Sequence, residues 1–389
     1  ALDAATTVND NTAFGYAALT SNTTGVENTA IGSGAMDQNT TGTDNTAVGW
    51  RAMYTNNGNY NTAVGNYSLY ANTTGAQNVS VGMVALSANT TGGGNVAVGA
   101  NALQSNTTGG QNAAVGASAL NAANASNNTA VGYQALTANT TGTKNVAIGA
   151  NALDANTEGD ANIAIGRDAL GANTTADENT AVGADALLLN TTGKRNVSIG
   201  AYSLDANTTA DLNTAVGYAA LSSNTTGSPN TAIGGYTLVS NTIGVRNTAV
   251  GYYTLYANTT GVNNTALGDS ALASNTTANN NTALGYNGLT ANTTGTQNTA
   301  VGVYVLDANT TGYNNTSMGY NSLSTNITGI DNTAVGKSAL NENTASNNTA
   351  VGSDAMEKNT TGDKSVAVGK NALKANTTGA RNTAIGYES

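Results

Sequence analysis

The chain has 389 residues with a formal net charge of −10, and only 9% of its residues are charged. A thinly spread negative charge disfavours nucleic acid and anionic membranes as partners, and no apolar run approaches the roughly 18 residues of a membrane span. His and Cys are both absent, which excludes His- and thiolate-based catalytic and metal sites, so we expect no enzyme, no metal and no cofactor.

One motif recurs along the whole chain. Its copy at residues 128–144 reads N-T-A-V-G-Y-Q-A-L-T-A-N-T-T-G-T-K, and its 23 copies are separated by 19 intervals of seventeen residues and three of sixteen. A fixed period of this length indicates a repeat architecture in which each coil contacts only its neighbours. We therefore predict a single continuous array over residues 1–389. Repeat positions are counted below from the recurring Asn, which is replaced once, by Ser365.

Positions 2 to 4 predict a short β-strand. Position 2 is Thr or a β-branched apolar residue, position 3 is small, and position 4 is apolar in every copy. This alternation is typical of a strand, with positions 2 and 4 on one face and position 3 on the other. We expect position 4 to form half of the core, represented by Val48, Val131, Ile148, Val250 and Val301.

Position 5 is Gly in every copy, which indicates a corner with positive φ or a backbone approach too close for a Cβ atom. The corner glycines include Gly49, Gly132, Gly149, Gly251 and Gly302.

Positions 8 to 11, with the pattern A-L-x-A, predict a second short strand. Position 9 is Leu or Met in all complete copies, so it supplies the other half of the expected core: Met53, Leu136, Leu153, Leu255 and Leu306. Runs of four residues between Gly corners are too short for helices.

The N-T-T-G segment predicts the second corner. All three shortened intervals lose their residue there, within 56–60, 123–127 and 343–347, and tolerance of length is typical of a loop. We expect the Asn side chains of positions 1 and 12, such as Asn128 and Asn139, to form ladders of hydrogen-bonded amides from coil to coil. Asn in these places also suits turns alone.

Two short strands and two corners per period predict an all-β fold, a parallel β-solenoid (β-roll) of about 23 coils. Two apolar ridges bury little surface compared with the backbone entropy of seventeen ordered residues. A second apolar surface that faces another chain is the simplest further source of burial. The small residues at positions 3 and 8, Ala130 and Ala135, would then pack either inside a narrow roll or across an oligomer axis.

The N-T-A-V-G…A-L-x-A-N-T-T-G unit resembles the S-V-A-I-G-x-x-S-x-A-x-G head repeat of trimeric autotransporter adhesins of the YadA type, and similar N-T-A-x-G arrays of phage tail-fibre-like and bacterial surface proteins. The resemblance covers the whole chain. It implies a left-handed parallel β-roll, three chains about one axis and a role in attachment. The period differs, because it is seventeen here and about fourteen in that family.

Aromatic residues follow the Gly corner in many copies. Such rows can stack on sugar rings or host receptors, because the ring faces are apolar while the polar end of the side chain contacts water. The simpler interpretation is that the rings cover the corner of the neighbouring coil. The position-6 candidates for ligand binding are Tyr16, Trp50, Tyr133, Tyr218, Tyr252, Tyr286 and Tyr320. The scattered carboxylates Asp154, Asp205, Asp307, Asp168, Asp185 and Asp354 are interpreted as solvated turn positions.

These features favour a structural fibre or adhesin segment, located on a cell or virion surface, that associates with copies of itself and contacts a host glycan or protein. One alternative is an extracellular filament joined end to end, since the chain begins mid-period at Ala1 and Leu2 and stops after Gly386. A third hypothesis is an ice-binding solenoid built on the Thr columns, although no strand carries a T-x-T pattern.

Overall fold

The computed structural model describes residues 9–389, so Ala1 and Leu2, on which the end-to-end hypothesis depends, lie outside the described residues. The chain forms two compact units, residues 1–195 and 196–389. The described residues contain 23 strands of three residues each and no helix. Every strand occupies positions 2 to 4 of one repeat, as predicted.

The strands of the first unit are β1 (Thr12–Phe14), β2 (Thr29–Ile31), β3 (Thr46–Val48), β4 (Thr62–Val64), β5 (Val79–Val81), β6 (Val96–Val98), β7 (Ala113–Val115), β8 (Thr129–Val131), β9 (Val146–Ile148), β10 (Ile163–Ile165) and β11 (Thr180–Val182). Those of the second unit are β12 (Val197–Ile199), β13 (Thr214–Val216), β14 (Thr231–Ile233), β15 (Thr248–Val250), β16 (Thr265–Leu267), β17 (Thr282–Leu284), β18 (Thr299–Val301), β19 (Thr316–Met318), β20 (Thr333–Val335), β21 (Thr349–Val351), β22 (Val366–Val368) and β23 (Thr383–Ile385).

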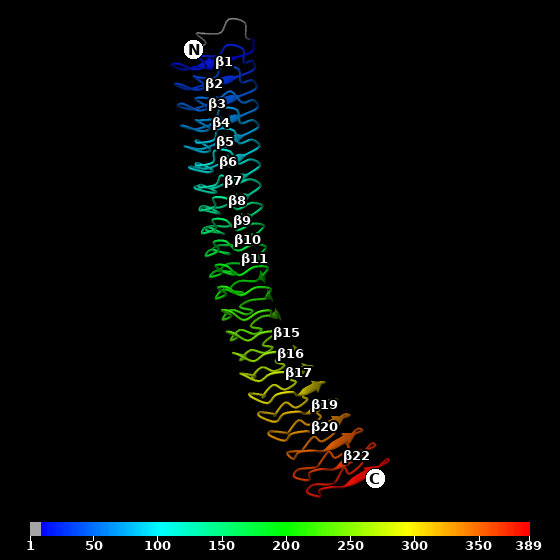
Figure 1. The fold of residues 1–389 in the computed structure, drawn as a ribbon. Coiled ribbons are helices and arrows are strands. Elements are labelled where there is room, and N and C mark those ends of the chain that lie inside the picture. Colours follow the sequence, from blue (N-terminus) through cyan, green and yellow to red (C-terminus); the bar gives the residue numbers. More distant parts are fainter. Residues whose placement is uncertain (1–8) are drawn as a thin grey trace. The chain divides into compact units, whose positions relative to one another are not determined.

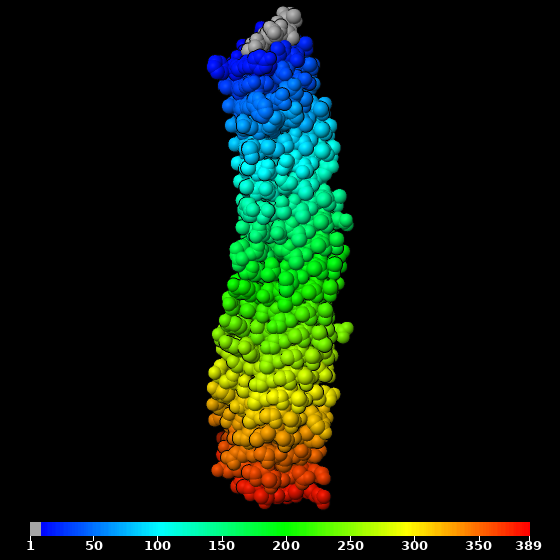
Figure 2. All heavy atoms as spheres, turned by 90° about the vertical axis from the view of Figure 1, so that its left-hand side faces the viewer, coloured from blue at the N-terminus to red at the C-terminus, as the bar shows by residue number. Residues whose placement is uncertain are grey.

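Within each unit, consecutive strands pair in parallel with equal repeat positions side by side. In the pair β8–β9, Thr129 lies opposite Val146 and Val131 opposite Ile148. The coils therefore stack as successive layers (Figure 1), and their side chains close the space between layers on the face seen in Figure 2. This confirms the parallel β-solenoid and the seventeen-residue period; the chain as one continuous array remains a prediction.

The interior of each coil is narrow and is filled from both sides by small and medium side chains. Ala130 at position 3, Ala135 at position 8 and Leu136 at position 9 are all fully buried within the single chain. The small residues therefore line the inside of the roll. The Leu and Met half of the predicted core is correct, since Met53, Leu136, Leu153, Leu255 and Leu306 are buried.

The position-4 half of the predicted core is wrong. Val131 and Ile148 are 37% and 38% exposed, and Val48, Val250 and Val301 are also partly exposed rather than buried. Neighbouring residues of a strand point to opposite faces, and the narrow interior accepts only Ala or Ser at position 3. Positions 2 and 4 therefore both point outward.

Positions 8 to 11 do not form the predicted second strand. Gln134 and Leu136 adopt left-handed backbone conformations, with φ of 54° each, and the adjacent Ala135 and Leu136 both point inward, which the alternation of a strand does not permit. The backbone still bonds from coil to coil, because the Leu136 N–H donates to the Ala152 carbonyl over 2.9 Å. We call residues at positions 6 to 13 the turn segment.

The predicted Gly corner at position 5 is confirmed. Gly49, Gly132, Gly149, Gly251 and Gly302 have φ between 130° and 138°, a region that side chains strongly disfavour. A Cβ atom on Gly132 would also collide with the carbonyl oxygen of Gly149 in the next coil.

Two buried amide ladders run from coil to coil, as predicted, with interruptions at Ala123 of position 12 and Ser365 of position 1. At position 12, Asn156 donates its Nδ2 to Asn139 Oδ1 over 2.9 Å, while Asn139 donates to the Gly142 carbonyl over 2.8 Å. At position 1, the Asn145 N–H donates to Asn128 Oδ1 over 3.0 Å. Shortened loops keep the pattern, since Asn56 donates to the Gly58 carbonyl instead.

Candidate functional site

The outward side chains of positions 2 and 4, called the strand face, form a continuous uncharged surface of Thr and apolar residues on each unit. Inner residues such as Val81 and Met318 are 36% and 47% exposed. None of the 23 copies has a charged residue at either position. A charge-free face of this extent is unusual on a solvated surface, where large apolar patches mark interaction sites.

Thr and apolar residues alternate across the strand face in a fixed order. Thr is the commonest residue at position 2, with Val, Ile or Ala in the remaining copies, while position 4 is always apolar. Because parallel strands repeat at about 4.8 Å and equal positions pair, each position forms a straight row along its unit. The face therefore presents the same chemistry in every coil.

The predicted aromatic candidates lie exposed on the turn segment, and most of them join rings from position 7. In the second unit Tyr218 contacts Tyr202 and Tyr236, with ring centroids 5.7 and 5.3 Å apart, and Tyr236 reaches Tyr252 at 6.1 Å. Tyr286 and Tyr320 both contact Tyr304, at 5.5 and 6.4 Å.

Tyr16 and Tyr133 stand apart from these ring chains. Tyr133 is 57% exposed and Tyr16 is 86% exposed, and neither has an aromatic ring contact within the part of the chain that the structure describes. The sequence candidates therefore separate into members of aromatic clusters and isolated surface residues.

The first unit contains a compact aromatic cluster that joins positions 6, 7 and 10. Trp50 and Tyr67 meet edge to face at 4.6 Å, Tyr54 and Tyr70 stack at 5.3 Å, and the Arg51 guanidinium lies 5.2 Å from the Trp50 ring centre. Of these residues, Trp50 at position 6 and Tyr67 at position 7 belong to the aromatic rows that the sequence shows beyond the Gly corner. The others could have been found, because residues one repeat apart, such as Tyr54 and Tyr70, lie side by side.

Two hollows flank this cluster. One, of about 120 Å³, is lined by Tyr16, Ser33, Gly34, Asp37, Trp50 and Arg51 among others, and the other, of about 380 Å³, by Tyr67, Tyr70, Val84 and Ala88 among others. Each hollow lies where large side chains at positions 6, 7 and 10 give way to small ones in the adjacent coil.

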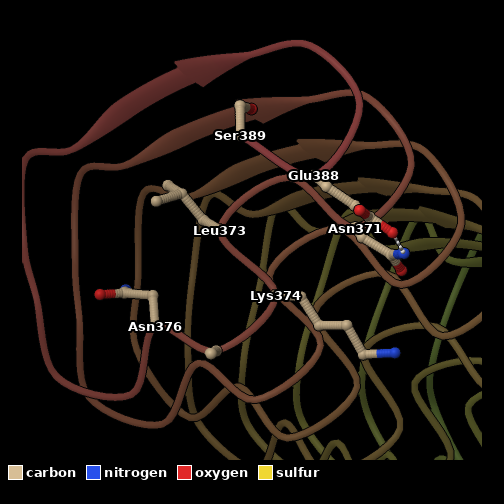
Figure 3. A pocket seen from close by; sticks show the side chains of 7 residues that line it. Asn371, Leu373, Lys374, Asn376, Glu388 and Ser389 are labelled. Carbon is tan, nitrogen blue, oxygen red and sulfur yellow. Dashed lines mark hydrogen bonds between the residues drawn. The ribbon is translucent and has the colours of Figure 1, made fainter.

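A third hollow, of about 520 Å³, lies at the last coil of the second unit (Figure 3). Leu373 and Asn376 point into the interior of the coil there, while Lys374 points away from it. Asn371 donates its side-chain N–H to Glu388 over 3.3 Å. This hollow is the stacking surface of a coil, built from the same positions that neighbouring coils cover elsewhere.

The carboxylates interpreted above as solvated turn positions lie in different surroundings. Burial raises the pKa of Asp154 and that of Asp307 above the ordinary value of 3.8. Asp185 instead pairs with the Arg167 guanidinium at 2.8 Å. No group of three or more acidic, His or Cys side chains suited to a metal ion occurs among residues 9–389.

Comparison of the chain with known protein families, curated proteins and solved structures finds no match. Over the same described residues there is no helix of the length and apolarity needed to cross a membrane.

Proposed function

We propose that this protein is a structural fibre segment whose chains associate side by side through the strand face, and that the assembly spaces or displays an attachment surface outside a cell or virion. The rigid β-solenoid supplies the support, and its chemistry requires no catalytic group. The observation that carries the proposal is the strand face, which is free of charge and presents an exposed apolar residue at position 4 of every coil.

Three chains about one axis is the arrangement that the resemblance to YadA-type head repeats favours. A face that presents identical rows in every coil gives an interface that grows with the number of coils, so many weak contacts add up along the stack. Association would cover the half-exposed Val and Ile side chains of position 4, which the single chain leaves in water at a cost of about 25 cal/mol per Å².

Light scattering coupled to size exclusion tests this proposal. We expect a mass three times that of one 38.4 kDa chain. Replacing Val131 and Ile148 together by Glu places charges in the interface and is expected to lower the fraction of assembled chains. The matched control, Thr141→Glu on an exposed corner, should leave the mass unchanged. A native protein that runs as a monomer at all concentrations contradicts the proposal.

Ice binding is a second candidate function, and one observation favours it. Position 2 points outward, so the Thr row of the strand face is available to solvent together with the row of position 4. A regular Thr array on a rigid sheet is a surface on which water can be ordered. A measurement of thermal hysteresis separates the candidates, since an assembly that covers the strand face should show none.

A further inference from the structure

We propose that the aromatic cluster around Trp50, together with the hollows on both sides of it, binds a neutral β-1,4-linked oligosaccharide that runs along the coil stack. The site occupies the turn segment, so it remains accessible whether or not the strand face associates.

The rings of the cluster provide stacking surfaces for sugars. Trp50 is 43% exposed, and Tyr54 and Tyr70 stack on each other beside it, with an interplanar angle of 13°, which holds the cluster in one arrangement. The face of an aromatic ring carries negative charge density. The axial C–H groups of a pyranose with equatorial hydroxyls carry partial positive charge, so such a sugar stacks on these faces.

The smaller hollow provides polar partners at its walls. Asp37 accepts a hydrogen bond from the Thr20 hydroxyl over 2.7 Å, which fixes the carboxylate. The Arg51 guanidinium lies over the rings of both Trp50 and Tyr54, at 5.2 and 5.3 Å. One carboxylate and one guanidinium offer both acceptors and donors without net charge, which suits the hydroxyls of a neutral sugar better than an ionic ligand.

Gly34 opens this hollow. Position 7 carries a Tyr in several other coils, such as Tyr67 and Tyr202, whereas Gly34 adds no side chain to the lining of this hollow. Its φ of 68° is close to the 54° of Tyr67, so the backbone conformation accepts a side chain, but a Cβ atom there would lie 3.2 Å from Arg51 Cγ and would require Arg51 to shift. The cavity depends on this one residue and not on a different fold of the coil.

The arrangement of the two hollows and the aromatic cluster along the coil stack favours an extended ligand. The two hollows lie on opposite sides of the aromatic cluster, and successive coils are about 4.8 Å apart, a spacing close to the advance of one sugar in an extended β-1,4 chain. A ligand that follows the stack therefore places successive sugars over successive coils. An α-1,4-linked chain of the same sugar curves away from a straight row of rings.

Fluorescence titration tests the site directly, because Trp50 is the one tryptophan of the chain. Titration with cellohexaose is expected to change the emission of Trp50 saturably, and the same concentrations of maltohexaose are expected to leave it unchanged. Trp50→Ala, followed by calorimetry, should weaken cellohexaose binding by at least about tenfold. Position 6 is Ala in native coils, at Ala100 and Ala150, so this variant should fold.

Variants that fill the hollow distinguish a binding site of defined shape from nonspecific contact with exposed aromatic rings. Gly34→Tyr adds an aromatic ring but closes the cavity, and we expect it to abolish cellohexaose binding, whereas Gly34→Ser should retain most of it. Tyr133→Ala, which removes an isolated exposed ring, should change nothing.

Four results would overturn the proposal: no response to cellohexaose at millimolar concentration, an equal response to maltohexaose, undiminished binding by Trp50→Ala, or undiminished binding by Gly34→Tyr. A proline-rich decapeptide is the competing probe, since extended proline helices also dock in aromatic grooves. Saturable binding of that peptide without binding of cellohexaose would likewise assign the cluster to a different partner.

Discussion

The strand segment (positions 1 to 5) and the turn segment (positions 6 to 13) of each coil stack on their neighbours by different means. In the strand segment, regular parallel pairing holds equal positions together. In the turn segment, two residues per coil adopt a left-handed backbone, and several backbone hydrogen bonds, such as those from the N–H groups of Leu136 and Ala138 to the carbonyls of Ala152 and Asp154, link the coils outside any strand. Parallel stacking therefore does not require β-strands on both sides of a solenoid.

The two segments also differ in how they use their surfaces. The strand segment shows the same Thr and apolar rows in every coil, while positions 6, 7 and 10 of the turn segment change from coil to coil. A uniform face suits an interaction that every coil repeats, and a variable surface suits a local site. This difference is why we assign self-association to the first and ligand recognition to the second.

The corner between the segments should be the most sensitive place in the coil. In Gly132→Ala, the Cβ atom would face the Gly149 carbonyl at a φ of 138°, so we expect a loss of roughly 3 kcal/mol in the free energy of unfolding of the first unit. Chemical denaturation measures the loss, and hydrogen exchange should place it near β8 and β9.

The matched control for the corner is Gly235→Ala, because position 6 is Ala in other coils and the new Cβ would contact only the Tyr252 ring. An equal effect of the two substitutions would refute the special role of the corner glycine.

A substitution at position 9 tests the backbone of the turn segment. Leu136→Val would suit a buried strand, but at a φ of 54° a β-branched residue is strained and fills the core less well, so we expect a loss of about 2 kcal/mol. Leu136→Met is the control, since Met36 and Met53 occupy the same position, and it should cost less than about 1.5 kcal/mol. Equal stability of the Val and Met variants would favour a strand there.

The sequence alone predicts the period, the strand, the Gly corner and the Asn ladders, because each depends on local constraints that every copy repeats. Positions 2 and 4 alone do not show which face of the strand is buried, since Thr, Val and Ile suit either side. The small residues at position 3 carry that information, because only a narrow interior requires Ala130 to face Ala135 and Leu136.

The predicted second strand is wrong for a related reason. Ala135 and Leu136 are adjacent and both apolar, which a strand with one buried face does not favour. Position 9 is also never β-branched, in contrast to position 8, where Val305 is buried. Both signals indicate a non-strand backbone at Leu136. The aromatic cluster, by contrast, follows from the predicted stack, since Trp50 and Tyr67 occupy positions 6 and 7 of adjacent coils.

A substitution of Ser365 is expected to change stability by a smaller amount. Ser365 takes the place of Asn in the position-1 ladder. Asn residues at this position donate to the carbonyl of position 15, as Asn348 does to Gly362 over 2.8 Å, whereas the Ser365 hydroxyl donates to the Asp363 carbonyl over 3.3 Å. Ser365→Asn is expected to add the bond to Gly379 and to stabilise the second unit by about 1 kcal/mol.

Thermal denaturation of Ser365→Asn measures this gain. Ser365→Ala should instead destabilise the unit, because the Asn382 N–H loses its acceptor. A Ser365→Asn variant that is less stable than the native chain would show that the new side chain does not form the hydrogen bond to the Gly379 carbonyl.

The smallest effect is expected on the outer side of the turn segment, at Asp307. Burial raises its pKa above 3.8, and its Oδ1 atom is buried without a hydrogen-bond partner, so the folded chain binds a proton more readily than the unfolded chain. The free energy of unfolding therefore falls as pH rises through the region just above 3.8 and stays lower beyond it. Asp307→Asn removes this dependence.

Asn is native at this position in other coils, where Asn341 donates to the Asn321 carbonyl over 2.8 Å, so an Asn at 307 can donate to the carbonyl of Asn287 in the same way. We expect Asp307→Asn to melt slightly higher than the native chain at pH 7, with the difference shrinking toward pH 3. The control Asp269→Asn, at an exposed position, should leave the melting temperature unchanged. A constant difference between the Asp307 variant and the native chain at both pH values would mean that the gain comes from the new hydrogen bond alone and that burial of the carboxylate contributes nothing.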